Sequence, residues 1–388
     1  MQSDARNSLD LDLAEERFLA AIDHTVGIEE EFAILDQTSF DLVPGFERLR
    51  EAAAIRDSLL CEGITGELIS SEVEIVSGRG EDLADAIARQ RERRRRLFAL
   101  AEQEGFVLGA TGTHPWADYR KQTVIDTEHY RRVAEGLQYV AARNNTFSLH
   151  VHVGVNNPDR AVKVCDRLRP VLPLLLALSA SSPYIDGRDS GLHSARTQTF
   201  TRSFPRCGVP DPFGSWAAYR QYIDVLRRTS SIVEFTQVWW SIRPHFAFGT
   251  VEVRICDAQI SGGESEALTA LIVACVAQAA RDIDEGVPFE DPPSRLIEEN
   301  MWRAIRFGLD GSMIDFAETE EYPSAAIAER LAAWTAPLRG ELGIDVLFPE
   351  RNGAQRQRSQ IAAGVPMEEV YASVVAETRQ TYAQEVTV

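Results

Sequence analysis

Residues 146–155 alternate strictly between apolar and polar side chains. The apolar positions are Phe147, Leu149, Val151, Val153 and Val155, and His150 and His152 fall between them. Because successive side chains of a β-strand point to opposite faces, this pattern predicts a strand with one face in a core and two neighbouring histidines on the other. The fold is therefore expected to contain a sheet that is apolar behind and polar in front.

Four other short segments are typical of strands, and they alternate with longer helical stretches. The strand-like segments are 25–35, 68–76, 106–110 and 249–257. The helical stretches are 9–22, 81–104, 127–143, 159–180, 214–228, 264–285 and 367–385. Their order has neither a regular βαβ rhythm nor a glycine-rich dinucleotide turn, so it favours an α+β fold. No repeat divides the chain, and the proline- and acid-rich segment 287–294 predicts a surface loop.

The strand-like segment 26–34 carries three consecutive glutamates. Glu29 and Glu31 share one face, whereas Glu30 falls on the apolar side. Two adjacent carboxylates repel each other unless a cation, a proton or a basic group lies between them, and a divalent ion with a preference for oxygen ligands is the usual solution. A solvated strand face is the alternative interpretation.

Segment 249–257 repeats this arrangement with an acid and a base. Glu252 and Arg254 lie on its polar side together with Thr250, and apolar residues occupy the other side. The alternative to a functional pair is an ordinary cross-strand salt bridge, which contributes little at a surface.

A fourth stretch, 67–76, is also acidic and does not fit a single regular strand. Glu72 and Glu74 share a face, but Glu67 has the opposite parity. A bend or bulge is needed to bring all three together. Gly66 precedes Glu67, and two serines, which are weak strand formers, follow it, so an irregular entry is consistent with the sequence.

Together these segments predict an antiparallel sheet lined in front by carboxylates, imidazoles and an arginine, curved over a cavity. Several glutamates with one or two nitrogen ligands favour Mg²⁺ or Mn²⁺ over structural zinc, because hard ions prefer oxygen and the sequence has no thiolate cluster. A His-x-His pair also occurs in zinc hydrolases and as ordinary hydrogen-bonded histidines, so both alternatives stay open at this point.

Composition narrows the class of protein. Asp and Glu outnumber Lys and Arg by 59 to 40, a formal net charge of −19, so binding to nucleic acid or to an anionic membrane is not expected. The five cysteines form no C-x-x-C pair and are expected to be reduced thiols. The first twenty residues lack a secretory signal pattern, and a cytoplasmic protein is expected.

One helical stretch is rich in arginine, with Arg91 and residues 93–96. This pattern predicts a helix face that is exposed to solvent.

Several ordered motifs resemble those of the type 2 glutamate–cysteine ligase family, from about residue 24 to the C-terminal helices. They are GIEEEF at 27–32, GTHP at 112–115, LHVHVG at 149–154, SART at 194–197, FPR at 204–206, GTVEVRICDA at 249–258 and ENMWRA at 299–304. The resemblance implies a glutamine synthetase-like catalytic fold, with a curved antiparallel sheet flanked by helices. It also implies a single ligase domain over 24–388, with residues 1–23 as an N-terminal extension outside the family pattern.

By motif matching, the resemblance also implies roles for individual residues. The implied metal ligands are Glu29, Glu31, Glu67, Glu74, His150 and Glu252. ATP and Mg²⁺, with Mn²⁺ as a substitute, are the implied cofactors. Arg254 is expected to contact the transferred phosphate and to act with Glu252 in catalysis, and His152 to assist at the nucleotide. Arg196 and Arg206 are expected to orient substrate carboxylates.

The activity that the resemblance implies is ATP-dependent amide formation between a small-molecule carboxylate and an amine. The reaction would pass through an acyl phosphate and release ADP and phosphate, and the product would be a γ-glutamyl amide. Two alternatives stay open: a metal-dependent hydrolase, and a relative that binds nucleotide without turnover. A homo-oligomer is expected only because symmetric assemblies are common among enzymes.

Overall fold

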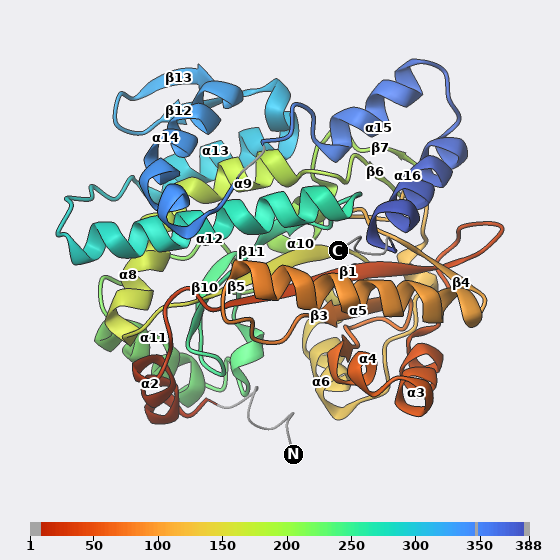
Figure 1. Cartoon of the computed structure of the whole chain (residues 1–388), viewed down its shortest axis with the longest axis horizontal. Helices are drawn as coiled ribbons and strands as arrows, with labels where there is room; N and C mark the ends of the chain where they lie inside the picture. Colours follow the sequence, from red (N-terminus) through yellow and green to blue (C-terminus); the bar gives the residue numbers. More distant parts are fainter. Residues whose placement is uncertain (1–8, 346–347, 384–388) are drawn as a thin grey trace.

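The computed structural model describes residues 9–345 and 348–383, and its centre is a seven-stranded antiparallel sheet (Figure 1). The strand order is β10-β11-β5-β1-β3-β2, with β4 also paired to β1. The bounds are β1 Val26–Asp36, β2 Ile64–Thr65, β3 Glu72–Val76, β4 Phe106–Gly109, β5 Ser148–Gly154, β10 Ile242–His245 and β11 Thr250–Asp257.

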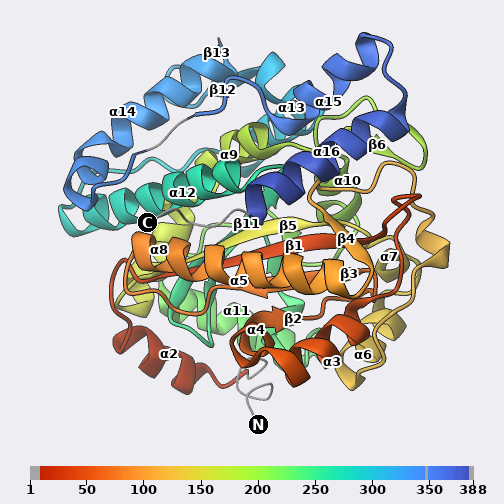
Figure 2. The same ribbon diagram turned by 45° about the vertical axis from the view of Figure 1, so that its right-hand side comes forward.

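Helices surround this sheet. Their bounds are α2 Leu11–Leu19, α3 Phe46–Arg56, α4 Ser58–Gly63, α5 Leu83–Gln103, α6 Glu128–Leu137, α7 Tyr139–Ala142, α8 Pro158–Leu168, α9 Leu172–Ser179, α10 Ala195–Thr201, α11 Trp216–Arg228, α12 Gly262–Asp284, α13 Ser294–Phe307, α14 Ser324–Leu342, α15 Gly353–Ala362 and α16 Met367–Tyr382. Short two-stranded pairs complete the fold: β6 Tyr184–Ile185 with β7 Arg188–Asp189, β8 Cys207–Gly208 with β9 Trp239–Trp240, and β12 Ser312–Asp315 with β13 Glu320–Pro323. Both views show α5 and α12 lying across the same face of the sheet (Figures 1 and 2).

Strand β1 is long enough to organise the whole sheet. Its residues 29–33 pair with β3 along one edge. Along the other edge, residues 26–30 pair with β5 and residues 33–36 pair with β4. One strand therefore brings the three glutamates of the 27–32 motif next to β3 on one side and next to the histidines of β5 on the other.

The apolar face of the sheet packs as the alternation predicts. Val151 and Val153 of β5 and Val251 and Val253 of β11 are fully buried in one core with apolar residues of α8, α9 and α12. Because the period of a strand is two, burying these side chains fixes the orientation of the intervening His150, His152 and Glu252 on the opposite face. The predicted α+β arrangement of an antiparallel sheet flanked by helices is confirmed.

Three predicted elements differ from the structure. The strand predicted over 68–76 begins only at Glu72, because the chain turns irregularly before it. The helix predicted over 127–143 breaks at Gln138, whose φ of 51° no helix accommodates. The stretch 159–180 breaks into α8, a 3₁₀ turn and α9, because Pro170 and Pro173 lack the N–H that a continuous helix needs.

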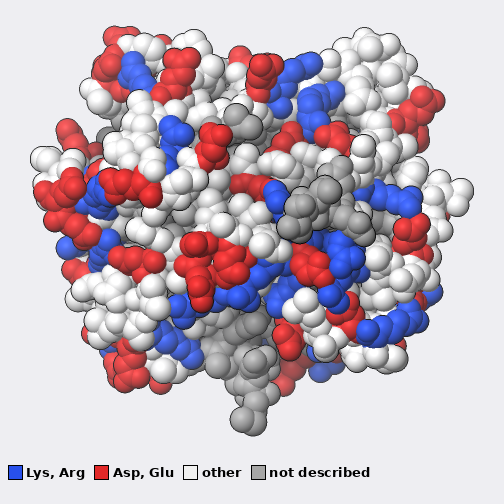
Figure 3. All heavy atoms as spheres, in the orientation of Figure 1, with Lys and Arg blue, Asp and Glu red and all other residues white. Residues whose placement is uncertain are grey.

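The arginine-rich helix α5 is also less exposed than its sequence suggests. Arg94 is fully buried behind β1, with Nε and Nη2 each 2.5 Å from the carboxylate of Glu30 and Nη1 2.9 Å from Glu266. Gln90 also donates to Glu30. The prediction of a solvated face is therefore wrong for Arg94 and for Arg93, which is buried too. The outer side of α5 is basic and bordered by acidic side chains (Figure 3).

The N-terminal segment packs onto the body of the molecule. Ala14 and Phe18 of α2 are buried in the main core, and Glu15 accepts hydrogen bonds from Trp216 and Arg220. Residues 1–8 of the predicted extension lie outside the described residues. No helix among the described residues is long and apolar enough to cross a bilayer.

Candidate metal and active site

The polar face of the sheet brings the predicted acids and histidines together. In the strand register, Glu29 lies opposite His150, Glu31 opposite Glu74, and Glu252 opposite His152. Directly opposed residues of an antiparallel pair have neighbouring side chains. The predicted segments therefore meet on one continuous face.

The distances show how closely these side chains approach. Glu29 lies between the two histidines, with one carboxylate oxygen 3.2 Å from His150 Nδ1 and the other 3.2 Å from His152 Nε2. His150 Nε2 is 3.9 Å from Glu31, and His152 Nε2 is 3.9 Å from Glu252. All five side chains form one contiguous cluster.

Within this cluster, three overlapping sets of ligand atoms have the size of a metal site. The atoms of each set lie within 4.8 Å of one another, and the sets are Glu29, His152 and Glu252; Glu29, Glu74 and His150; and Glu31, Glu67 and Glu74. Glu29 and Glu74 each belong to two sets. The donors are mostly carboxylate oxygens with one imidazole at most in each set, which fits Mg²⁺ or Mn²⁺ better than a structural zinc.

Within the described residues, the carboxylates of Glu67, Glu72 and Glu74 at one end of the cluster form no ion pair with a basic side chain. Burial and the neighbouring Glu31 raise the pKa of Glu67 to about 8. Burial, together with the neighbouring carboxylates, also raises the pKa values of Glu72 and Glu74 well above their usual range. A buried set of mutually repelling carboxylates is the environment that a divalent cation would neutralise, so the donor set fits such an ion.

The other end of the cluster is neutralised by arginines. Burial opposes ionisation of Glu252, but the guanidinium groups of Arg243 and Arg254 outweigh it and hold the pKa of Glu252 well below its usual range. Arg243 Nε lies 2.5 Å from one oxygen of Glu252, and Arg254 donates to the other. Arg254 Nη1 also lies 3.4 Å from His150 Nδ1. The cluster thus runs from a carboxylate-rich end to an arginine end.

The irregular entry to β3 carries Glu67 into the cluster. A Cβ atom on Gly66 would lie only 2.5 Å from the ring of Phe46, so the close approach at this bend requires glycine. The Tyr130 hydroxyl of α6 donates to the carbonyl of Gly66 and closes over the bend. The bend needed to unite Glu67 with Glu74 is therefore present, and it replaces the predicted start of the strand.

The two arginines expected to bind substrate occupy different places. Arg196 is buried, and its two terminal nitrogens donate to the carbonyls of Ile255 and Arg254 at 3.1 and 3.2 Å. Arg206 donates to the carbonyl of Gln237 and lies over the ring of Trp239, apart from the three ligand sets. Their expected substrate contacts stay predictions.

Two residues at the site were not assigned a role from the sequence. Glu72 lies on the same face of β3 as Glu74 and is fully buried. The sequence indicated this position, because Glu72 and Glu74 are two residues apart and therefore share a strand face. Arg243 faces Glu252 across the β10–β11 pair. Finding Arg243 required knowing that β10 pairs with β11, which no local pattern around it indicates.

The sequence matches the model of the glutamate–cysteine ligase family 2 over residues 25–351. The chain belongs to this family. A relative from Solibacter usitatus is 37% identical over 340 residues, covering 86% of this chain and 88% of its own. A Sorangium cellulosum relative is 41% identical over 299 residues, covering 77% and 79%. Both are named provisionally as glutamate–cysteine ligases of type 2. The predicted family, and the prediction that the chain is a carbon–nitrogen ligase enzyme, are confirmed.

Solved structures share the fold of this family member at low sequence identity. A glutamate–cysteine ligase from Francisella tularensis in complex with AMP has a TM-score of 0.65 at 12% identity, covering 94% of this chain and 90% of its own. A bifunctional glutathione synthetase from Pasteurella multocida has a TM-score of 0.66 at 11% identity, covering 96% of this chain and 54% of its own. These likenesses confirm the predicted fold.

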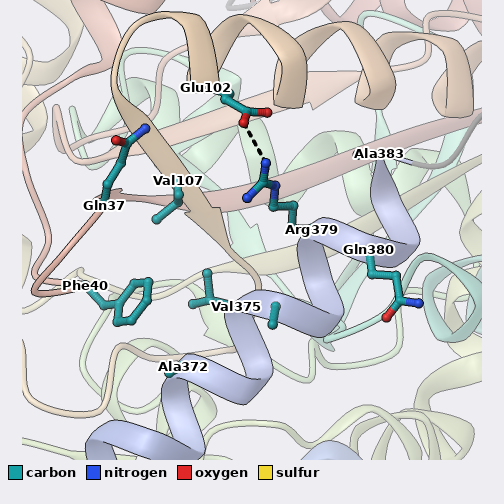
Figure 4. Close-up of a pocket in the computed structure, with 10 residues that line it drawn as sticks. Gln37, Phe40, Glu102, Val107, Ala372, Val375, Arg379, Gln380 and Ala383 are labelled. Atoms are coloured by element: carbon teal, nitrogen blue, oxygen red, sulfur yellow. Dashed lines mark hydrogen bonds and ion pairs between the residues drawn. The ribbon is translucent and has the colours of Figure 1, made fainter.

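A separate recess lies between β4 and α16 (Figure 4). It has a volume of about 650 Å³ and is lined by Phe40, Val107 and Val375, with an ion pair between Glu102 and Arg379 at its edge. None of the clustered carboxylates or histidines lines it. It is therefore distinct from the candidate metal site.

The raised pKa values predict a linkage between pH, metal binding and stability. The folded state holds protons on Glu67, Glu72 and Glu74 at pH values where the unfolded state has lost them. The free energy of unfolding of metal-free protein should therefore fall as pH rises from about 5 to about 8. A divalent cation replaces these protons, so it should bind more tightly as pH rises over this range.

Thermal unfolding with EDTA or with Mn²⁺, at pH 6.0 and 8.5, measures this linkage. The metal-free Tm should be lower at pH 8.5, and the increase caused by Mn²⁺ should be larger there. Glu67→Gln should reduce the difference between the two pH values. An increase in Tm that is the same at both pH values would contradict the assignment of these carboxylates as ligands.

Proposed function

We propose that this family member is an ATP-dependent carboxylate–amine ligase that forms a γ-glutamyl amide. One observation carries the proposal. The three ligand sets overlap at Glu29 and Glu74, and Arg254 contacts Glu252 at one end of them. We take 24–388 as one ligase domain and residues 1–23 as an N-terminal extension, of which helix α2 packs on the domain.

The donor sets fit Mg²⁺. The residues proposed to hold it are Glu29, Glu31, Glu67, Glu74, His150 and Glu252, and His152 lies in the set formed by Glu29 and Glu252. Bound there, magnesium would neutralise negative charge on the phosphate oxygens of ATP during transfer. All of these ligands except Glu67 lie on paired strands, so the ladder sets their spacing before any substrate binds.

The first step of the proposed reaction is transfer of a phosphoryl group to the acid. A carboxylate oxygen attacks the γ-phosphorus of ATP, the bond from that phosphorus to the β,γ-bridging oxygen breaks, and ADP leaves. Arg254 would hold the phosphoryl group in transit, because a guanidinium matches phosphate oxygens and keeps its charge at any working pH. Its contact with Glu252 keeps it at the arginine end of the cluster.

In the second step the amine displaces phosphate. The amine nitrogen attacks the acyl carbon, the bond from that carbon to the phosphate oxygen breaks, and the nitrogen loses a proton as the amide forms. His152 would lie beside the nucleotide, held by its contacts with Glu29 and with the Thr250 hydroxyl at 3.0 Å. Small-molecule carboxylates and amines are the proposed substrates, with Arg206 as a candidate for carboxylate binding.

A coupled assay of ADP release with Mg²⁺ and ATP tests this function. Glutamate with cysteine is the first pair, followed by other amino acids as acid and amine, with mass measurement of the amide. We expect ADP release that requires both substrates and one amide per ADP. Bound nucleotide without ADP release from any pair would favour the non-catalytic relative, and amide hydrolysis without ATP would favour a hydrolase.

A further inference from the structure

Strand β11 contains a bulge at the residue proposed to hold the phosphoryl group. Val253 pairs with Val151 and Cys256 pairs with Leu149, so two residues of β11 face a single residue, His150, of β5. A bulge disrupts the ladder locally and turns the side chains of the bulged strand. Here the bulged residues are Arg254 and Ile255, so the direction of the Arg254 side chain depends on how the bulge is held.

Arg196 binds the carbonyl groups of this bulge. Its Nη1 donates to the carbonyl of Ile255 at 3.1 Å and its Nη2 to that of Arg254 at 3.2 Å. The guanidinium is a planar fork, so two adjacent acceptors fix its plane as well as its distance. The Arg196 side chain therefore binds the backbone at Arg254.

Arg196 is itself held by a buried acid. Asp257 is completely buried, with one carboxylate oxygen 3.7 Å from the Arg196 guanidinium. Asp257 accepts hydrogen bonds from the hydroxyls of Ser182 and Ser194 at 2.6 and 2.9 Å, and the Ser182 hydroxyl accepts from the backbone N–H of Arg196 at 3.2 Å. A Cβ atom on Gly112 would lie 2.6 Å from the Asp257 carboxyl carbon, so the surrounding chain is packed tightly against this acid.

We infer that Arg196, held by Asp257, is a positioning residue for Arg254. The buried pair fixes the bulge, and the fixed bulge directs the Arg254 guanidinium to Glu252 and His150. The catalytic consequence rests on the proposed function, whereas the geometric consequence does not. This role differs from direct binding of a substrate carboxylate by Arg196, which would affect substrate affinity and leave Arg254 in place.

The geometric consequence is tested by crystal structures of the Arg196→Met and Arg196→Lys variants of the full chain. We expect Arg254 to lose its contacts with Glu252 and His150 in Arg196→Met, while the ligand sets formed by Glu29, Glu31 and Glu74 stay in place. The lysine variant keeps the positive charge but offers one ammonium nitrogen in place of the planar two-nitrogen fork, so it should show a smaller displacement than Arg196→Met. An Arg254 guanidinium that keeps both contacts in both variants would overturn the inference.

The catalytic consequence is tested by a double-mutant cycle on kcat for ADP release. Arg254→Met should lower kcat by about 10²–10³-fold, as loss of one preorganised group at a transferring centre does. Arg196→Met should lower kcat with little change in KM for the acid, and the double variant should be no slower than Arg254→Met. Multiplicative losses, or a loss confined to KM of the acid, would overturn the positioning role.

Arg169→Met is the matched control. Arg169 is also completely buried and binds the carbonyl of Pro210 and the carboxylate of Asp291, but it contacts none of the clustered residues. It should lose stability and keep the wild-type kcat. If wild-type protein releases no ADP with any substrate pair, the proposed function fails, and the crystal structures still decide the geometric inference.

Discussion

Replacing Glu29 with glutamine is expected to lower metal-dependent ADP release by at least about 10²–10³-fold. Glu29 contributes to two of the three ligand sets and lies 3.2 Å from each histidine. Glutamine keeps the shape but loses the charge that attracts a divalent cation, so two sets are weakened by one change. The measurement is the initial rate of ADP release at saturating ATP and Mg²⁺, together with Mn²⁺ affinity.

Glu51→Gln is the control for this variant, because Glu51 is an exposed acid on α3. It should keep the rate and the Mn²⁺ affinity of the wild type. Circular dichroism and Tm should show that both variants are folded. Wild-type activity and Mn²⁺ affinity in Glu29→Gln would be incompatible with its role as a shared ligand.

Replacing Arg94 with methionine is expected to lower the free energy of unfolding by about 3–5 kcal/mol. Arg94 and Glu30 are only 2% and 4% exposed as side chains, so removing the guanidinium leaves a buried carboxylate without its counter-charge. Gln90 and Ser265 still donate to Glu30, but neutral donors do not replace the lost charge. Urea unfolding at pH 7.5 measures the loss.

Arg89→Met tests the same change on the same helix at an exposed pair. Arg89 lies 2.8 Å from Asp85, and the two side chains are 49% and 35% exposed to solvent. Its loss should cost at most about 1 kcal/mol, because solvent screens such pairs. Equal losses for the two variants would mean that burial of the Glu30–Arg94 pair does not determine its contribution.

The strand faces could be predicted because the period of two is a local property. The alternation around His150 and around Glu252 gave the correct face for both, and the parity of Glu29 and Glu31 did the same. The helix break at Gln138 could not be predicted in this way. The break at Gln138 depends on a left-handed backbone position that its side chain does not require, and none of the local signals predicts it.

Contacts between segments that are far apart in the sequence could not be predicted from local patterns. Glu30 looked misplaced on an apolar face because its partner, Arg94, comes from a helix more than sixty residues later. The same holds for Arg196 of helix α10, whose acceptors are two adjacent backbone carbonyls at the bulge in β11. A bulge follows from the register of two strands, and no residue type marks it in the sequence.

The most direct test is a crystal structure with Mn²⁺ and a non-hydrolysable ATP analogue, using anomalous scattering to locate the metal. Anomalous peaks are predicted at the ligand sets around Glu29 and Glu74, with the terminal phosphate of the analogue next to Arg254. Manganese and nucleotide bound elsewhere, with no peak between Glu29, Glu74 and His150, would contradict the account.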